Sequence, residues 1–145
     1  MNETIRRFGY PATLIAEYEH WLVLLRPAQP TLGSLVLAAK SDATAFSALD
    51  PAATAGLQPT VADIERTLKH AVSYERINYL MLMMVDPHVH FHVLPRYEGE
   101  RSACGLTVPD MGWPKVPALG EAMELDEAQT AALAGWLRSL WPSAR

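Results

Sequence analysis

The segment DPHVHFHVLPR, residues 86–96, puts three histidines at alternate positions, with apolar residues in the gaps. Residues two apart in a β-strand point to the same face of the sheet, so the three imidazoles would share one face. The apolar set would share the other face and point toward the core. The two sets are His88, His90 and His92 on one side, and Val89, Phe91 and Val93 on the other. We predict a half-buried strand whose histidine side is open or faces a cleft.

Three roles compete for this histidine face. It could be a solvated face, although the whole chain has only five histidines. It could bind a metal ion, but His88 and His92 would lie about 13 Å apart on a straight strand, with Asp86 as the one obvious further ligand nearby. It could act in nucleophilic catalysis, because a neutral imidazole is a good nucleophile near pH 7. Attack of the central His90 on phosphorus would give a phospho-imidazole that water then cleaves.

The composition is that of a single globular domain. The chain has 145 residues, 50% of them hydrophobic and 19% charged, with a formal net charge of -4. Its Lys and Arg residues are scattered, whereas duplex nucleic acid needs clustered cations, so we expect no duplex partner. The chain has a single cysteine, Cys104, no apolar leader and no apolar run of about 20 residues. These features favour a cytoplasmic protein that does not enter a membrane.

Apolar stretches predict strands at 12–19, 20–26, 33–40 and 76–85, ahead of the histidine strand. Only the dipeptide Asp86-Pro87 then separates the last two strands, which predicts a hairpin. Asp50 and Pro51 predict the start of a helix, with an apolar face that continues to Val72. Pro59 lies inside this run and predicts a kink or a later helix start.

The chain after Arg96 is rich in proline and glycine up to residue 124. Asp126 and Gln129 then predict a capping box for a last helix. The apolar stripe of that helix is Leu133, Trp136, Leu137, Leu140 and Trp141. This order of elements predicts an α+β fold, an antiparallel sheet with helices on one side.

The motif HVHFHVL, residues 88–94, resembles the signature of the histidine triad (HIT) superfamily of nucleotide hydrolases and transferases. The ending HVLPR is similar to that of its dinucleoside polyphosphate hydrolase branch. Upstream, HWLVLLRPAQPTLGSLVLAAK (residues 20–40) resembles the family's paired strands joined by a proline loop that ends in glycine. The resemblance covers roughly residues 12–96.

The resemblance implies that His90 is the nucleophile and that His88 and His92 support it. It implies a nucleoside phosphate hydrolase or nucleotidyl transferase with a nucleotidyl-histidine intermediate. No cofactor would be required, although a divalent metal stays open. It also implies one HIT-like domain over residues 1–145, with 97–145 as a C-terminal extension, and a sheet doubled across a homodimer. The apolar tail from Tyr97 onward fits such a partner, because we expect it to lack a core of its own.

The sequence departs from the family pattern at three places. First, Ser34 follows Gly33, where family members often carry histidine. Second, the loop before His88 is short and has no glutamine to contact a phosphate. Third, Leu25 and Arg26 occupy the region where members often have an Asn or Asp that contacts the ribose. Phosphate binding would therefore fall to other residues. The candidate substrate-binding residues are Ser34, Arg26 and Arg96, and no metal ligands are assigned. Two alternatives stay open, a nucleotide-binding protein with little catalysis and a metal-binding module.

Overall fold

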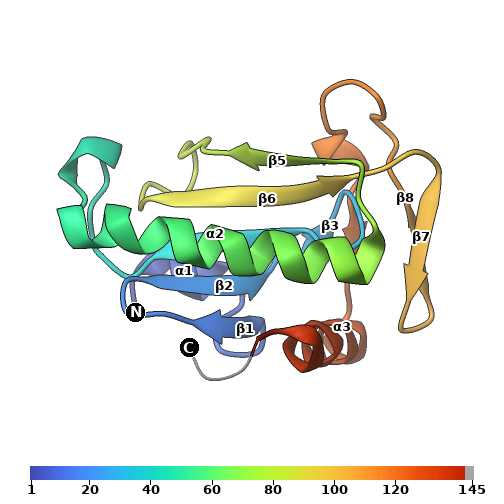
Figure 1. Ribbon diagram of the computed structural model, residues 1–145, viewed down its shortest axis with the longest axis horizontal. Coiled ribbons are helices and arrows are strands. Elements are labelled where there is room, and N and C mark those ends of the chain that lie inside the picture. The colour runs from blue at the N-terminus through green and yellow to red at the C-terminus, as the bar shows by residue number, and fades with distance from the viewer. Residues whose placement is uncertain (143–145) are drawn as a thin grey trace.

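A five-stranded antiparallel sheet carries the histidine segment, in the order β1-β2-β4-β6-β5 (Figure 1). The computed structural model describes residues 1–142. The strands are β1 (Leu14–Glu17), β2 (Trp21–Leu25), β4 (Leu35–Ala39), β5 (Arg76–Leu80) and β6 (His90–Arg96). The predicted strands at 12–19, 20–26 and 33–40 are thus confirmed, each somewhat shorter than predicted. All five residues of β2 and of β4 are buried, as their continuous apolar sequences indicate.

Two small sheets and two short 3-10 helices complete the framework. Strand β3 (Ala28–Gln29) pairs with β9 (Met123–Glu124), and β7 (Glu100–Ala103) pairs with β8 (Leu106–Pro109). The 3-10 helices are η1 (Phe46–Ala48) and η2 (Leu119–Glu121). The β3–β9 pair matters for the site, because it ties the loop after β2 to the C-terminal segment.

The two predicted helices form, with the predicted caps. Helix α2 (Pro51–Val72) begins with Asp50, whose side chain accepts a hydrogen bond from the Ala52 N–H. The helix runs on past Pro59, so a start near that proline is wrong. Helix α3 (Glu127–Leu140) has the complete capping box of Asp126 and Gln129.

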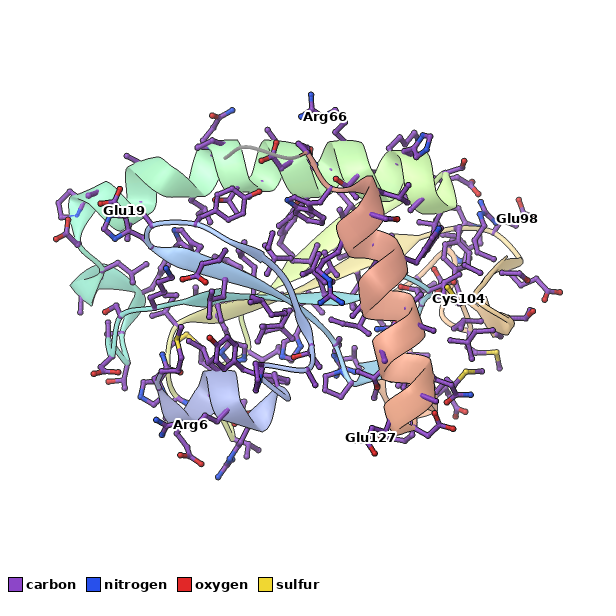
Figure 2. All side chains as sticks on the ribbon, turned by 90° about the horizontal axis from the view of Figure 1, so that it is seen from below. Arg6, Glu19, Arg66, Glu98, Cys104 and Glu127 are labelled. Carbon is purple, nitrogen blue, oxygen red and sulfur yellow. The ribbon has the colours of Figure 1, made fainter. Side chains whose placement is uncertain are left out.

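The larger core lies between the sheet and the two long helices. Side chains from β2 and β4 meet helix residues such as Ile64, Leu68, Leu133 and Leu137. The prediction of an antiparallel sheet with helices on one side is confirmed for α2 and α3. A short helix that was not predicted, α1 (Glu3–Arg7), lies on the opposite face, as Figure 2 shows. Its Ile5 is fully buried against the other faces of β2 and β4.

The hairpin of β5 and β6 is confirmed, but its turn is not the dipeptide Asp86-Pro87. Leu80, the last residue of β5, pairs with His92, so residues 81–89 form the connection between the strands. The predicted strand at 76–85 was therefore five residues too long. In this connection Leu82, Met84 and Val85 are exposed, so their apolar character does not reflect a buried strand.

The C-terminal extension packs on its own chain. Leu106 and Val108 belong to the larger core, which corrects the expectation that the tail lacks one. The Tyr97 hydroxyl accepts a hydrogen bond from the Leu32 N–H and donates one to the Val108 carbonyl. Arg96 forms a buried ion pair with Asp110 at 2.7 Å. Within residues 1–142, no helix is long and apolar enough to cross a membrane.

Candidate functional site

The histidines lie beneath helix α1, at the start of β6. His90 and His92 pair with Ala38 and Val36 of β4, and paired residues point to the same side of a sheet. Because Ala38 and Val36 pack against α1, His90 and His92 face that helix as well. Only 2% of His90 and 8% of His92 is exposed, so the expectation of an open histidine face is wrong. His88 precedes the strand and is half-buried.

The apolar set lies on the side of α2, as predicted. Val89 and Val93 are fully buried in the larger core. Phe91 is only half-buried, and its ring lies 6.2 Å from that of Trp21 and 6.0 Å from that of Phe46, between ring centroids. The alternation of the sequence therefore assigned the two faces correctly, although it did not show what covers the histidines.

The tautomer of His90 follows from its backbone neighbour. Its Nδ1 lies 2.7 Å from the His88 carbonyl oxygen. Because a carbonyl oxygen can only accept, Nδ1 must carry the proton of the neutral ring. The lone pair of His90 is then on Nε2, the nitrogen that a nucleophile at this position would use.

His92 is held in the opposite tautomer by Arg26. The Arg26 Nε donates a hydrogen bond to His92 Nδ1 at 3.2 Å, so the proton of the neutral ring is on Nε2. Burial, the Arg26 charge and His90 together lower the pKa of His92 to about 4. Burial also lowers the pKa of Arg26 itself. His92 is therefore a neutral hydrogen-bond donor at pH 7.

Helix α1 supplies the remaining contacts. Thr4, which is 1% exposed, places its Oγ1 2.9 Å from His88 Nδ1. The Phe8 ring lies 5.5 Å from the His90 ring and 5.6 Å from the His92 ring, between centroids. All three imidazoles are thus held at Nδ1, and the described residues give none of their Nε2 atoms a hydrogen-bond partner.

A salt bridge fixes α1 to the segment before the triad. Arg7 Nη1 lies 3.2 Å from Asp86 Oδ1. At the other end of the helix, the Asn2 side chain caps the Ile5 N–H and donates to the carbonyls of Ala39 and Ser41. The helix is therefore anchored on both sides of Thr4.

Of the three predicted substrate-binding residues, the structure brings only Arg26 to the histidines. The Ser34 hydroxyl is buried and donates to the Thr31 carbonyl at 2.8 Å. Arg96 lies four residues beyond His92 on β6, about 13 Å along the strand, and its guanidinium is engaged by Asp110 and Asn78. In this conformation, the polar groups of Ser34 and Arg96 therefore make contacts within the protein that stabilise the fold.

Sequence reasoning missed Thr4, Phe8 and Arg7. One signal was present, since Asn2 is a good N-cap residue ahead of a short polar and apolar run. A helix of five residues gives no readable periodicity, however, and its contacts with the triad span more than 80 positions in sequence. Within residues 1–142, no group of three or more His, Cys, Asp or Glu side chains is arranged to hold a metal ion.

Comparison with known proteins points to one family. The family model described as "HIT domain" matches residues 8–99, which is more than half of the chain. A search of curated proteins found no match.

Several solved structures share the fold. A histidine triad protein from Sinorhizobium meliloti superimposes with a TM-score of 0.72 at 23% identity, over 96% of this chain and 94% of that one. One from Bradyrhizobium japonicum gives a TM-score of 0.71 at 19% identity, over 96% and 95%. A histidine triad nucleotide-binding protein from Sulfolobus tokodaii gives 0.68 at 20% identity, over 94% and 88%.

Proposed function

Since the chain belongs to the HIT domain family, we propose that it is a nucleoside phosphate hydrolase or nucleotidyl transferase that acts through His90. Within that class we place it nearest to the dinucleoside polyphosphate hydrolases, on the resemblance of residues 92–96. One observation carries the assignment of the nucleophile. The bond from His90 Nδ1 to the His88 carbonyl leaves the lone pair on Nε2.

The proposed reaction has two displacements at phosphorus. His90 Nε2 attacks the α-phosphorus, a P–N bond forms, and the bond from phosphorus to the leaving oxygen breaks with its electron pair on that oxygen. Water, or the hydroxyl of an acceptor, then attacks the same phosphorus and loses a proton to solvent. The P–N bond breaks and its electrons return to Nε2. While His90 is modified its ring carries positive charge, which the hydrogen bond to the His88 carbonyl stabilises.

His92 and Arg26 would stabilise the developing negative charge. The neutral His92 offers its Nε2–H as a donor, because the lowered pKa of about 4 keeps the ring unprotonated near pH 7. Arg26, bonded to His92, keeps a positive charge next to the imidazole pair. Such preorganised donors are a large source of rate acceleration in phosphoryl transfer.

A trapping experiment tests the nucleophile. The protein is incubated with diadenosine triphosphate, quenched in alkali, which preserves phosphoramidates, and mapped by peptide mass spectrometry. We expect one added adenosine monophosphate on the peptide that contains His90. His90→Asn should give no adduct and no turnover, while His70→Asn, at an exposed histidine of α2, should behave as the wild type. An adduct on another residue, or full activity of His90→Asn, would refute the assignment.

The burial of His90 favours a second candidate, a nucleotide-binding protein with little catalysis. The Phe8 ring covers both central imidazoles, and His90 is 2% exposed. In that case nucleotides would bind in calorimetry without turnover, and Phe8→Ala, which uncovers the imidazoles, would be expected to raise the rate. If the first candidate is right, the ring moves aside on binding and wild-type turnover is measurable.

A further inference from the structure

Residues 26–34 join β2 to β4, and the side chain of Gln29 lies inside this loop with no exposed surface. Its Nε2 donates to the Arg26 carbonyl at 2.7 Å and to the Ser34 carbonyl at 2.9 Å. Its Oε1 accepts from the N–H groups of Gly33 and Ser34, at 2.9 Å and 3.2 Å. A side-chain amide has two donor hydrogens and two acceptor lone pairs, so Gln29 uses its full hydrogen-bonding capacity to close the loop.

Arg26 connects this loop to the triad. Its backbone is held at both polar groups, because its N–H donates to the Ser34 carbonyl at 3.0 Å and its carbonyl accepts from Gln29. Its side chain turns back over the loop, where Nη1 donates to the Ala28 carbonyl at 2.6 Å. Nε lies 3.2 Å from His92 Nδ1. The orientation of the guanidinium toward His92 therefore depends on the loop conformation that Gln29 fixes.

Strand β9 supports the same loop from outside the segment that matches the family model. Gln29 pairs with Met123, and Ala28 pairs with Glu124. Burial lowers the pKa of Arg26, and the negative charge of Glu124 opposes this effect. The C-terminal segment thus contributes both backbone pairing and charge to the loop that carries Arg26.

We propose that Gln29 is a positioning residue, whose four hydrogen bonds fix Arg26 so that Arg26 holds His92 as an Nε2–H donor. This inference rests on the proposed function and names the group that orients the donor. A neutral imidazole can carry its proton on either nitrogen, so His92 needs a donor at Nδ1 to keep the proton on Nε2. Without the Gln29 amide, Arg26 loses its single orientation and His92 loses that donor.

A purely structural role of Gln29 would have a different consequence. Loss of the amide would then lower the melting temperature, but the molecules that stay folded would keep Arg26 on His92. Burial is the largest cause of the lowered pKa of His92, followed by the Arg26 charge. His90 lowers this pKa further, and Asp86 opposes the shift. Of these contributions, the one from Arg26 is the one that the Gln29 contacts control, so the state of the His92 ring distinguishes the two roles.

NMR of the histidine ring tests the proposal. Full-length protein with ¹⁵N-labelled histidine is titrated with acid, and the Nδ1 and Nε2 shifts of His92 give its tautomer and its pKa. Turnover of diadenosine triphosphate is measured on the same samples. The variant Gln29→Met keeps a long side chain without the amide. The control is Thr31→Val, because Thr31 is buried in the same loop and its hydroxyl contacts Ser34 Oγ at 2.9 Å rather than Arg26.

We expect Gln29→Met to raise the pKa of His92 from about 4 to about 5 or higher, to place part of the proton on Nδ1, and to lower turnover about tenfold. Thr31→Val should leave the pKa and the tautomer of His92 as in the wild type.

A folded Gln29→Met protein whose His92 titrates as in the wild type would overturn the inference, whatever its melting temperature. If Gln29→Met does not fold, Gln29→Asn takes its place and must shift the pKa of His92 in the same direction, because its amide is one methylene too short to reach both ends of the loop. Absence of turnover in the wild type would refute the proposed function, while the NMR result would still decide whether Gln29 positions Arg26.

Discussion

The three imidazoles of the site are held at the same nitrogen by three different kinds of partner. A hydroxyl from Thr4 contacts His88, a backbone carbonyl contacts His90, and the Arg26 guanidinium contacts His92. Each partner restricts its ring, and the partners of His90 and His92 also select the tautomer, so the three Nε2 atoms are left for a ligand. At this scale the site is preorganised before any substrate arrives.

The contact between Thr4 and His88 should be a positioning interaction. Thr4→Val keeps the shape of the side chain and removes the hydroxyl, so we expect turnover to fall about tenfold, while Thr4→Ser retains most of it. The ¹⁵N chemical shifts of His88 should change in Thr4→Val, which loses the hydrogen bond at Nδ1, and stay near the wild-type values in Thr4→Ser. Equal rates and unchanged shifts in both variants would show that Thr4 only fills space.

The lowered pKa of His92 makes stability depend on pH. The unfolded ring binds a proton near pH 6.5, whereas the folded ring binds one only near pH 4. The contribution of His92 is therefore complete above about pH 6.5 and is lost as the pH falls toward 4, by about 3 kcal/mol in total. Urea unfolding at several pH values should show this loss in the wild type.

Carboxylates also titrate in the lower part of this window, so the difference between wild type and variant is the informative quantity. The free energy of unfolding of His92→Gln should lose its dependence on pH between 6.5 and 5. That of His70→Gln, at an exposed histidine, should keep the wild-type dependence. An NMR titration of His92 with a midpoint near 6.5 would contradict the prediction.

Local pattern predicted much of the site, and tertiary contact supplied the rest. The alternation at residues 88–93 placed the imidazoles together and assigned Val89 and Val93 to the core. Nothing local could show that Thr4 meets His88, because 84 positions separate them. Charge alone suggested Arg26 and Arg96 equally, and only packing shows that one meets the triad and the other meets Asp110.

At the scale of elements, the sequence predicted the residues that cap the helices, but it did not predict correctly where a helix or a strand is interrupted. Asp50 and Asp126 act through contacts within one helical turn, so the sequence nearby contains the whole signal. Pro59 signals a break, yet α2 continues because Ile64 and Leu68 beyond it are fully buried against the sheet. The run at residues 81–85 has the composition of a strand but lies in an exposed connection.

Pro59 should therefore be a point of local weakness in α2. Proline has no N–H, so the carbonyl four residues earlier loses its helical partner, at a cost of up to about 3 kcal/mol relative to alanine. Pro59 is exposed, so Pro59→Ala sacrifices little packing, and we expect it to raise the free energy of unfolding by about 1–3 kcal/mol. Gln58→Ala, at an exposed neighbour, should change it by less than about 0.5 kcal/mol. A lower stability of Pro59→Ala in urea unfolding would contradict this.

At the scale of the whole molecule, the two edges of the main sheet differ. Helix α3 lies next to β1 in Figure 1 and contacts that strand, whereas β5 is the end strand of the sheet and has no strand paired to its outer edge among the described residues. Exposed apolar side chains at Leu82, Met84 and Val85 continue from that open edge. An unpaired strand edge with apolar neighbours is a template for pairing with a second chain.

We therefore predict a symmetric homodimer in which β5 pairs with β5 of a second copy and buries more than about 1,000 Å². Pairing in the plane of the sheet leaves the face with the triad accessible. Light scattering at micromolar concentration should give twice the chain mass of 16.0 kDa, and hydrogen exchange should protect the β5 amides. A mass of 16.0 kDa at all concentrations would contradict the dimer.

The buried pair of Arg96 and Asp110 has a consequence for where this protein ends as a folding unit. The family match stops at residue 99, but Arg96 inside it is 3% exposed and takes its carboxylate from outside it. A polypeptide cut after Gly99 would lose the counter-ion of Arg96 and, with it, the core side chains Leu106 and Val108. In the intact chain, losing the Asp110 carboxylate alone would leave a buried guanidinium unpaired, a defect that costs about 3–5 kcal/mol in comparable cases. The segment that matches the family model is thus shorter than the segment that must be kept together for the fold. During divergence, position 110 is free to lose its acid only if position 96 loses its arginine as well.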